Sequence, residues 1–131
     1  MADVKAVKID EMEAAYGGAF KRARAELGVT SFGMQVIDMP PNWGDYPEHS
    51  HDEDGQEEVY FALSGSGELE VEGERIPLTS DTFVKVGPAT KRKIYPGPDG
   101  MRLLAIGGVP GGTFTAHPIT ELGGPETMEG I

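Results

Sequence analysis

The sequence predicts an all-β protein with one short N-terminal helix. The chain of 131 residues contains 19 Gly and 10 Pro, and most of them separate short apolar runs in the manner of turns between strands. From residue 31 onward these runs recur at the spacing of an all-β fold. A chain of this length buries a core of its own, so we expect one domain overall.

The N-terminal part, residues 1–30, is expected to hold a short strand and a helical segment. Residues 4–9, "VKAVKI", read as the strand. Residues 10–27 read as one helix, or as two short helices broken at the glycine pair at 17 and 18, because glycine weakens a helix interior. Asp10 is the expected N-cap, and Gly28 ends the segment.

Residues 31–110 are expected to form the β-rich body, and residues 111–131 a C-terminal tail. The first strand, "SFGMQVIDM", places Phe32, Met34 and Val36 on one face. The later strands are predicted at "EEVYFALSG", "GELEVEG", "ERIPLT", "TFVKVG", "KRKIY" and "MRLLAIGG".

Two of these strands, "VYFALS" and "MRLLAI", are apolar on both faces. One face of an antiparallel sheet usually meets water, so an apolar second face indicates a covering element. A second subunit would cover it in a homodimer, which we expect. The alternative is coverage by the chain's own helix and tail.

Composition excludes several classes of protein. The net charge of −11 repels phosphates, so neither nucleic acid nor an anionic membrane is expected as a partner. The chain has no cysteine, which excludes thiol chemistry. It has no secretory signal pattern and no apolar run of about 20 residues, so we expect a cytoplasmic protein.

Three candidate metal ligands lie close together in "HSHDEDGQEEVYFALSGSG", residues 49–67. His49 and His51 are two apart, which puts both imidazoles on one face of an extended segment. Glu58 begins the next strand and shares its face with Tyr60 and Gln56. Two imidazoles and one carboxylate suit a divalent metal such as Zn, Fe, Mn or Ni.

The same stretch resembles the first motif of the cupin superfamily: His-x-His, a short spacer, Glu58, six intervening residues and Gly65. The segment "GELEVEGERIPLTSDTFVKVGPATKRKIY" resembles the linker and second motif. The resemblance covers residues 31–107. It implies a small conical β-barrel, a double-stranded β-helix jelly roll, with a metal between His49, His51, Glu58 and a fourth ligand.

The sequence departs from this pattern in two places. Six residues, "DEDGQE", separate His51 from Glu58, which is more than usual. This acidic loop either bulges at the mouth of the barrel or brings Asp52, Asp54 or Gln56 into the site. In the second motif Arg92 stands where a third histidine is expected, and alternation turns it toward the barrel interior. An arginine keeps its proton and cannot bind a metal.

Two readings of the site therefore stay open. In the first, His49, His51 and Glu58 hold a metal in a dioxygenase, isomerase or lyase acting on a small polar or acidic ligand. In the second, Arg92 pairs with Glu58 or with an anionic ligand, and the chain is a metal-free small-molecule binding module or a structural homodimer with a degenerate site. The candidate ligand-binding residues are Arg92, Tyr60, Gln56 and Trp43, no catalytic residue is assigned, and His117 is expected at the surface, with a role as a cap over the site as the alternative.

Overall fold

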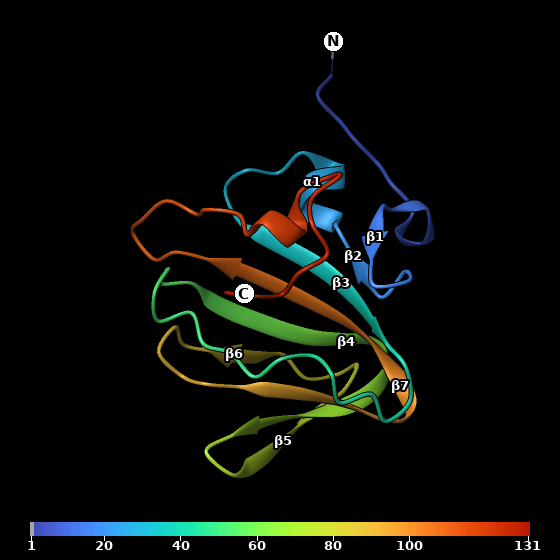
Figure 1. The fold of residues 1–131 in the computed structure, drawn as a ribbon, viewed down its shortest axis with the longest axis vertical. Coiled ribbons are helices and arrows are strands. Elements are labelled where there is room, and N and C mark those ends of the chain that lie inside the picture. The colour runs from blue at the N-terminus through green and yellow to red at the C-terminus, as the bar shows by residue number, and fades with distance from the viewer. Residues whose placement is uncertain (1) are drawn as a thin grey trace.

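The computed structural model describes residues 2–131 and shows the predicted all-β architecture (Figure 1). One antiparallel sheet, in the order β1-β2-β3-β7-β4-β5 with β6 paired to β4, curls into a small barrel. Its elements are η1 (Ile9–Glu11), β1 (Ala14–Ala15), β2 (Phe20–Lys21), α1 (Ala23–Leu27), β3 (Gly33–Met39), β4 (Glu57–Val71), β5 (Glu74–Leu78), β6 (Val84–Val86), β7 (Lys93–Gly108) and η2 (Pro118–Thr120). Among the described residues, no helix has the length and hydropathy to cross a membrane.

Two long strands, β4 and β7, lie next to each other in the middle of the sheet. Each joins two of the predicted strands into one, and they pair over nearly their whole length, from Glu57 opposite Gly108 to Glu70 opposite Lys93. Two irregularities in the register between 62 and 67 bend the pair. The bend keeps the strand continuous where the sequence pattern, interrupted by "SGSG", indicated a turn.

The core fills the inner face of this sheet. Alternation turns Tyr60 and Ala62 of β4 inward, opposite Ala105 and Leu103 of β7. The other face of β4 points outward, as alternation predicted. Phe61 on this outer face is half-buried. On β3 the predicted face holds for Met34 and Val36, but Phe32 is 37% exposed because the strand begins only after it, at Gly33.

The N-terminal segment has the predicted short helix, but the predicted strand and the predicted extent of the helix were wrong. Residues 4–8 have no regular structure, and the only α-helix among the described residues is α1. Tyr16, Gly17 and Gly18 all have positive φ angles, which turn the chain back and pair β1 with β2 in place of a helix. Asp10 caps no helix; its carboxylate lies 2.6 Å from Arg102 Nη2. Gly28 does end α1 in the left-handed conformation.

The N-terminal segment covers part of the outer sheet face. This agrees with the alternative in which the chain's own segments, and not a second subunit, cover the apolar strands. Met12 and Ala23 pack on Val36 of β3, together with partly buried Ile9 and Leu104. Arg22, almost fully buried, then ties this segment to the tail through hydrogen bonds from Nε to the Ile119 carbonyl (2.7 Å) and from Nη2 to the Gly124 carbonyl (2.9 Å).

Gly65 is required where β4 crosses β7. Its φ is +67°, and an added Cβ would lie 2.3 Å from the Gly100 carbonyl oxygen. We expect Gly65→Ala to lower the free energy of unfolding by about 2 kcal/mol or more, since a left-handed alanine alone costs about 1–2 kcal/mol. Gly73→Ala is the matched control, because Gly73 also has a positive φ (+80°) but has open space around it. Equal losses in urea unfolding would contradict the predicted clash.

Candidate metal centre

His49 and His51 lie on an extended segment fixed to the strand region that carries Arg92. The His49 N–H donates to the Arg92 carbonyl (3.0 Å) and the Arg92 N–H to the His49 carbonyl (2.9 Å), while the His51 N–H donates to the Pro88 carbonyl (2.8 Å). The two rings lie 5.1 Å apart, at 87° to each other. The predicted shared face is therefore present.

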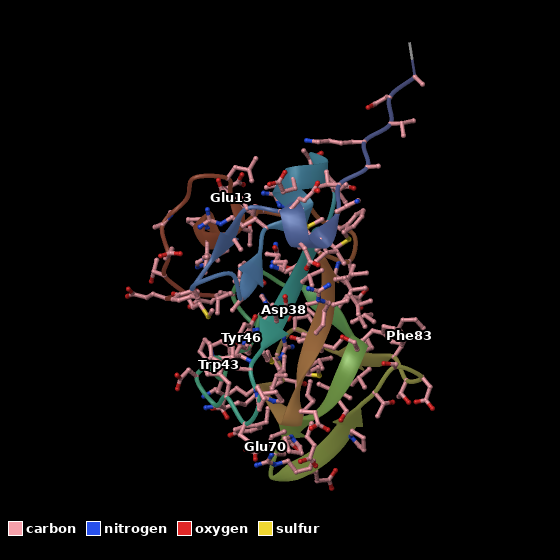
Figure 2. All side chains as sticks on the ribbon, turned by 90° about the vertical axis from the view of Figure 1, so that its right-hand side faces the viewer. Glu13, Asp38, Trp43, Tyr46, Glu70 and Phe83 are labelled. Atoms are coloured by element: carbon pink, nitrogen blue, oxygen red, sulfur yellow. The ribbon has the colours of Figure 1, made fainter. Side chains whose placement is uncertain are left out.

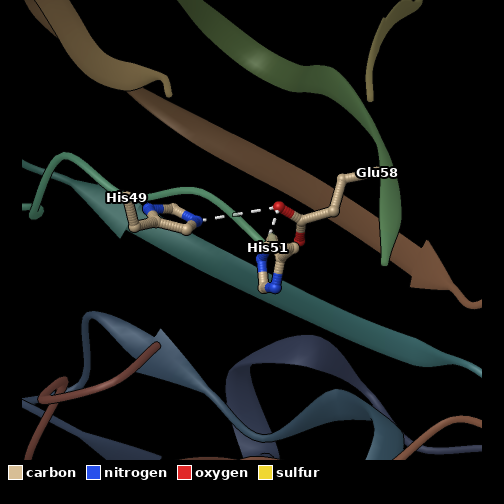
Figure 3. A group of neighbouring side chains, drawn as sticks. All are labelled: His49, His51 and Glu58. Atoms are coloured by element: carbon tan, nitrogen blue, oxygen red, sulfur yellow. Dashed lines mark ion pairs between the residues drawn. The ribbon is translucent and has the colours of Figure 1, made fainter. Parts of the chain in front are cut away.

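Glu58 completes the group from the inner face of β4. Ligand atoms of His49, His51 and Glu58 all lie within 4.8 Å of one another, in a geometry that could hold a metal ion. Figure 3 shows the two imidazoles pointing at the Glu58 carboxylate, with His51 Nε2 at 3.0 Å and His49 Nε2 at 3.7 Å from its Oε1 atom.

The second nitrogen of each ring fixes how the histidines face the site. His49 Nδ1 lies 3.0 Å from the Pro47 carbonyl, and His51 Nδ1 lies 3.1 Å from both carboxylate oxygens of Asp54. Carbonyl and carboxylate oxygens only accept hydrogen bonds, so both Nδ1 atoms carry hydrogen. Both Nε2 atoms therefore face Glu58, the arrangement in which metal-binding histidines are usually held.

The donor set fits a cation. His51 Nε2 is buried without a hydrogen-bond partner, although Glu58 Oε1 lies within ion-pair distance. When the imidazoles are neutral, two nitrogen lone pairs and one carboxylate face one another, and a cation between them would be attracted by all three groups. A borderline divalent metal satisfies all three groups.

Arg92, which the resemblance to the second motif aligns with a third histidine, points inward, as alternation predicted. Its side chain is fully buried. Nη1 donates to Glu58 Oε1 (2.6 Å) and to the Tyr60 hydroxyl (3.3 Å), Nε to the Thr90 carbonyl and Nη2 to the Gly87 carbonyl. The guanidinium is thus bound by protein acceptors and pairs with Glu58, as the second reading expected.

The Glu58 carboxylate divides its contacts unequally. Arg92, His51 and the Tyr60 hydroxyl (2.5 Å) all meet Oε1, and the described residues make no hydrogen bond to Oε2. Burial acts to raise the pKa of Glu58, but its contacts with His49, His51 and Tyr60 outweigh burial and hold this pKa well below its usual range. The carboxylate is therefore ionised at neutral pH.

A small cavity of about 50 Å³ opens above these groups. On this scale a water molecule needs about 10–15 Å³, so the cavity takes an ion with a few waters or a ligand of a few atoms. Its roof comes from the C-terminal tail, and its walls include Gln35, Tyr46, Gln56, Phe114, His117 and Ile131.

The four predicted ligand-binding residues have different places. Gln56 lines the cavity, and its amide Nε2 donates to Asp54 (2.9 Å), which in turn holds His51. Tyr60 and Arg92 lie behind Glu58 and are absent from the cavity wall. Trp43 lines a different hollow. The acidic loop contributes Asp54 to the site, while Asp52 is exposed.

His117 reaches the cavity wall, as the alternative for this residue expected, but it offers no free ring nitrogen. Nδ1 accepts from the Ile119 N–H (3.1 Å), so Nε2 carries the hydrogen and donates to the Glu129 carbonyl (2.7 Å). His117 therefore holds the tail in place over the cavity and is not a metal ligand in this arrangement.

Sequence reasoning missed Gln35. It lies on the inner face of β3 and lines the cavity, and its Oε1 is buried without a partner. The signal was present in the sequence. Alternation places Gln35 on the strand face opposite Met34 and Val36, and its neighbours on that face, Ile37 and Met39, are apolar. A polar side chain at such a position needs a partner.

Comparison with known proteins agrees with this architecture. A family model described as a cupin domain matches residues 35–107. A cupin protein from Bacteroides fragilis has 24% identity and a TM-score of 0.70, covering 89% of this chain and 93% of that one. A putative sugar phosphate isomerase from Acidithiobacillus ferrooxidans has 27% identity and a TM-score of 0.58, with 67% and 56% covered. A predicted oxalate decarboxylase from Thermotoga maritima has 19% identity and a TM-score of 0.52, with 59% and 65% covered. No curated protein matches.

Proposed function

The chain belongs to the cupin family, and we propose that it is a metal-binding cupin whose metal is held by His49, His51 and Glu58. The observation that carries the proposal is the convergence of two imidazoles and one ionised carboxylate, whose ligand atoms all lie within 4.8 Å of one another. The bound metal would act as a Lewis acid on a small polar ligand. With two imidazoles and one carboxylate, Zn, Fe, Mn and Ni are the candidate ions.

The cavity limits what the ligand can be. Gln35 presents a buried acceptor without a partner, which favours a ligand that carries an O–H or N–H group. At about 50 Å³ the cavity admits only a few atoms, so a larger substrate requires the tail to move. The name of the Acidithiobacillus relative supports an isomerase among the candidate reactions, with lyase and dioxygenase activity as the alternatives.

Metal analysis of protein purified without an affinity tag tests the proposal. Wild type is expected to bind about one divalent ion per chain, and His49→Ala and His51→Ala to bind it at least tenfold more weakly. His117→Ala is the matched control, because His117 is a histidine at the cavity wall whose ring nitrogens are engaged elsewhere. Equal trace metal in wild type and His49→Ala would refute a specific site.

A metal-free binding module is the second candidate function. It is favoured by the Arg92–Glu58 pair, which already neutralises the carboxylate at 2.6 Å. A thermal-shift screen of small organic acids in the presence of a chelator tests this alternative. Two results together would replace the metal proposal with this one: the wild type binds no metal, and one organic acid selectively raises its melting temperature in the presence of the chelator.

The stability of the metal-free protein should fall as the pH rises above about 6.5, the unfolded pKa of histidine. Burial acts to lower the pKa of His51, but Glu58 and Asp54 outweigh burial and raise it. A raised folded-state pKa stabilises the fold fully below the unfolded value, about 6.5, and this contribution is lost as the pH passes the folded-state pKa. Glu58 titrates far below this window.

Melting temperatures of chelated protein between about pH 6 and pH 8.5 check the expectation. His51→Gln should remove most of the decline. Because a metal displaces the proton from His51, the apparent metal affinity of wild type should rise over the same range. A pH-independent difference between wild type and His51→Gln would contradict the assignment.

The predicted homodimer stays a prediction, and we propose the outer face of β4 as its interface. Phe61 stacks on Phe83 with ring centroids 4.6 Å apart, and Phe83 is 72% exposed. The N-terminal segment covers the outer face near Val36 but leaves these rings uncovered. A two-fold axis through this patch would bury the same surface on both copies. Sedimentation is expected to show a dimer, which Phe83→Ser should dissociate. Val4→Ser is the control, because Val4 is also exposed but lies outside the patch, and it should leave the dimer intact. A monomeric wild type would refute the proposed interface.

A further inference from the structure

A second hollow lies on the outside of the barrel, formed by the loop after β3, the β1–β2 turn and the tail. Its volume is about 690 Å³, within the range of small-molecule sites. We call it the Trp43 groove, and its walls include Tyr16, Trp43, Asp45, Pro47, Met128 and Glu129. Figure 2 shows Trp43 on the opposite side of the molecule from Phe83, so the groove is separate from the proposed dimer face.

The two aromatic rings of the groove are held in position. The Tyr16 N–H donates to Glu126 Oε1 (2.8 Å), and its hydroxyl donates to the Glu126 carbonyl (2.9 Å). Its φ of 54° is unfavourable for a bulky residue, and residues held in this way cluster at ligand sites. Trp43 Nε1 donates to Asp45 Oδ2 at 3.2 Å. The rings need little ordering when a ligand arrives.

The charge of the groove selects a cation. Among its lining residues the only ionisable groups besides Tyr16 are two carboxylates, Asp45 and Glu129, and the net charge of the chain is −11. An anion would be repelled, and a neutral ligand would leave the carboxylates unused. Aromatic faces beside carboxylates attract cations through the ring quadrupole and the acid charge together.

The apolar part of the lining selects the kind of cation. A primary ammonium or a guanidinium needs several hydrogen-bond acceptors. The side chains of the groove offer two carboxylates, of which Asp45 already uses one oxygen on Trp43, and the remaining walls include prolines and Met128. A methylated ammonium needs no acceptor and packs its methyl groups on aromatic and apolar surface. We propose that the Trp43 groove binds a small quaternary ammonium compound.

The fluorescence of Trp43 tests the proposal directly, because it is the only tryptophan of the chain. Choline is expected to change the emission saturably, and 3,3-dimethylbutan-1-ol, its neutral isostere, to bind at least tenfold more weakly. Asp45→Asn should weaken choline binding by about three- to thirtyfold, the range of a cation–π and charge contribution. Methylammonium and guanidinium should bind more weakly than choline.

Glu74→Gln is the matched control, an exposed acid on the far hairpin that should leave choline binding unchanged. Trp43→Leu, followed by calorimetry with a check of its melting temperature, removes the ring itself. The proposal fails if choline gives no saturable signal, if the neutral isostere binds equally well, or if Asp45→Asn and Glu74→Gln have the same effect. Tighter binding of guanidinium would assign the groove to arginine side chains of a protein instead. The metal content is read separately, so failure here leaves the metal proposal untouched.

Discussion

Glu58→Ala is expected to lower the free energy of unfolding of the metal-free protein by about 3–5 kcal/mol, the cost of leaving one member of a buried ion pair without its partner. Arg92 is fully buried and Glu58 is 13% exposed, with 2.6 Å between Nη1 and Oε1. Removal of the carboxylate leaves this guanidinium charge, and the Tyr60 hydroxyl, without their acceptor. Denaturant unfolding in the presence of a chelator measures the loss.

Glu70→Ala is the control on the same strand. Glu70 pairs with Arg75 at 3.0 Å, but both side chains are partly exposed, so its removal should cost less than about 1 kcal/mol. The double variant Glu58→Gln/Arg92→Met should regain most of the stability, since a buried pair can often be replaced by uncharged groups without loss. A Glu58→Ala variant as stable as Glu70→Ala would show that the pair contributes nothing.

The strands of the body were predictable because alternation and turn residues are local signals. β3, β5 and β6 fall within the predicted runs, and Leu69 is buried beside exposed Glu68 as the pattern of β4 indicates. The joining of runs into β4 and β7 was not predictable, since the bend near Gly65 depends on how closely two strands cross. That approach is a tertiary distance without a period in the sequence.

In the N-terminal segment a local signal was present but misleading, because it indicated a longer helix than the one that forms. The charges of residues 10–27 match a helix dipole, but the left-handed turn at Tyr16 and the pairing of Phe20 with Ile37 stabilise a small sheet extension instead. Propensity is a weak guide where tertiary pairing competes with it. The burial of Arg22 against the tail is a contact over about a hundred positions, which no local pattern reports.

For the site, the spacing of His49, His51 and Glu58 was informative because each residue lies on an extended segment with a defined face. The groups that orient them could not be read in the same way. Asp54 reaches His51 through a loop, and the Pro47 carbonyl that holds His49 belongs to the backbone. Trp43 was a candidate ligand-binding residue, but the loop after β3 carries it to a hollow that does not include His49, His51 or Glu58.

Arg92→His is expected to increase metal affinity by about tenfold to a hundredfold. Position 92 is paired through its backbone with His49 and its side chain points inward, so a histidine there supplies a third imidazole. The change also removes a charge that repels the ion, an effect worth a few kcal/mol at an effective dielectric near 20. Competition with a chromogenic chelator measures the affinity.

Arg92→Met separates the two contributions. It removes the positive charge and frees Glu58 Oε1 but supplies no ligand, so its gain in affinity should be smaller than that of Arg92→His. Both variants lose the hydrogen bonds to the Thr90 and Gly87 carbonyls, and the metal-free forms should therefore be less stable than wild type. Equal gains would mean that the arginine limits binding by its charge alone. No gain in either variant, in protein that remains folded, would mean that position 92 has no influence on the ion and that the three-ligand site is complete without it.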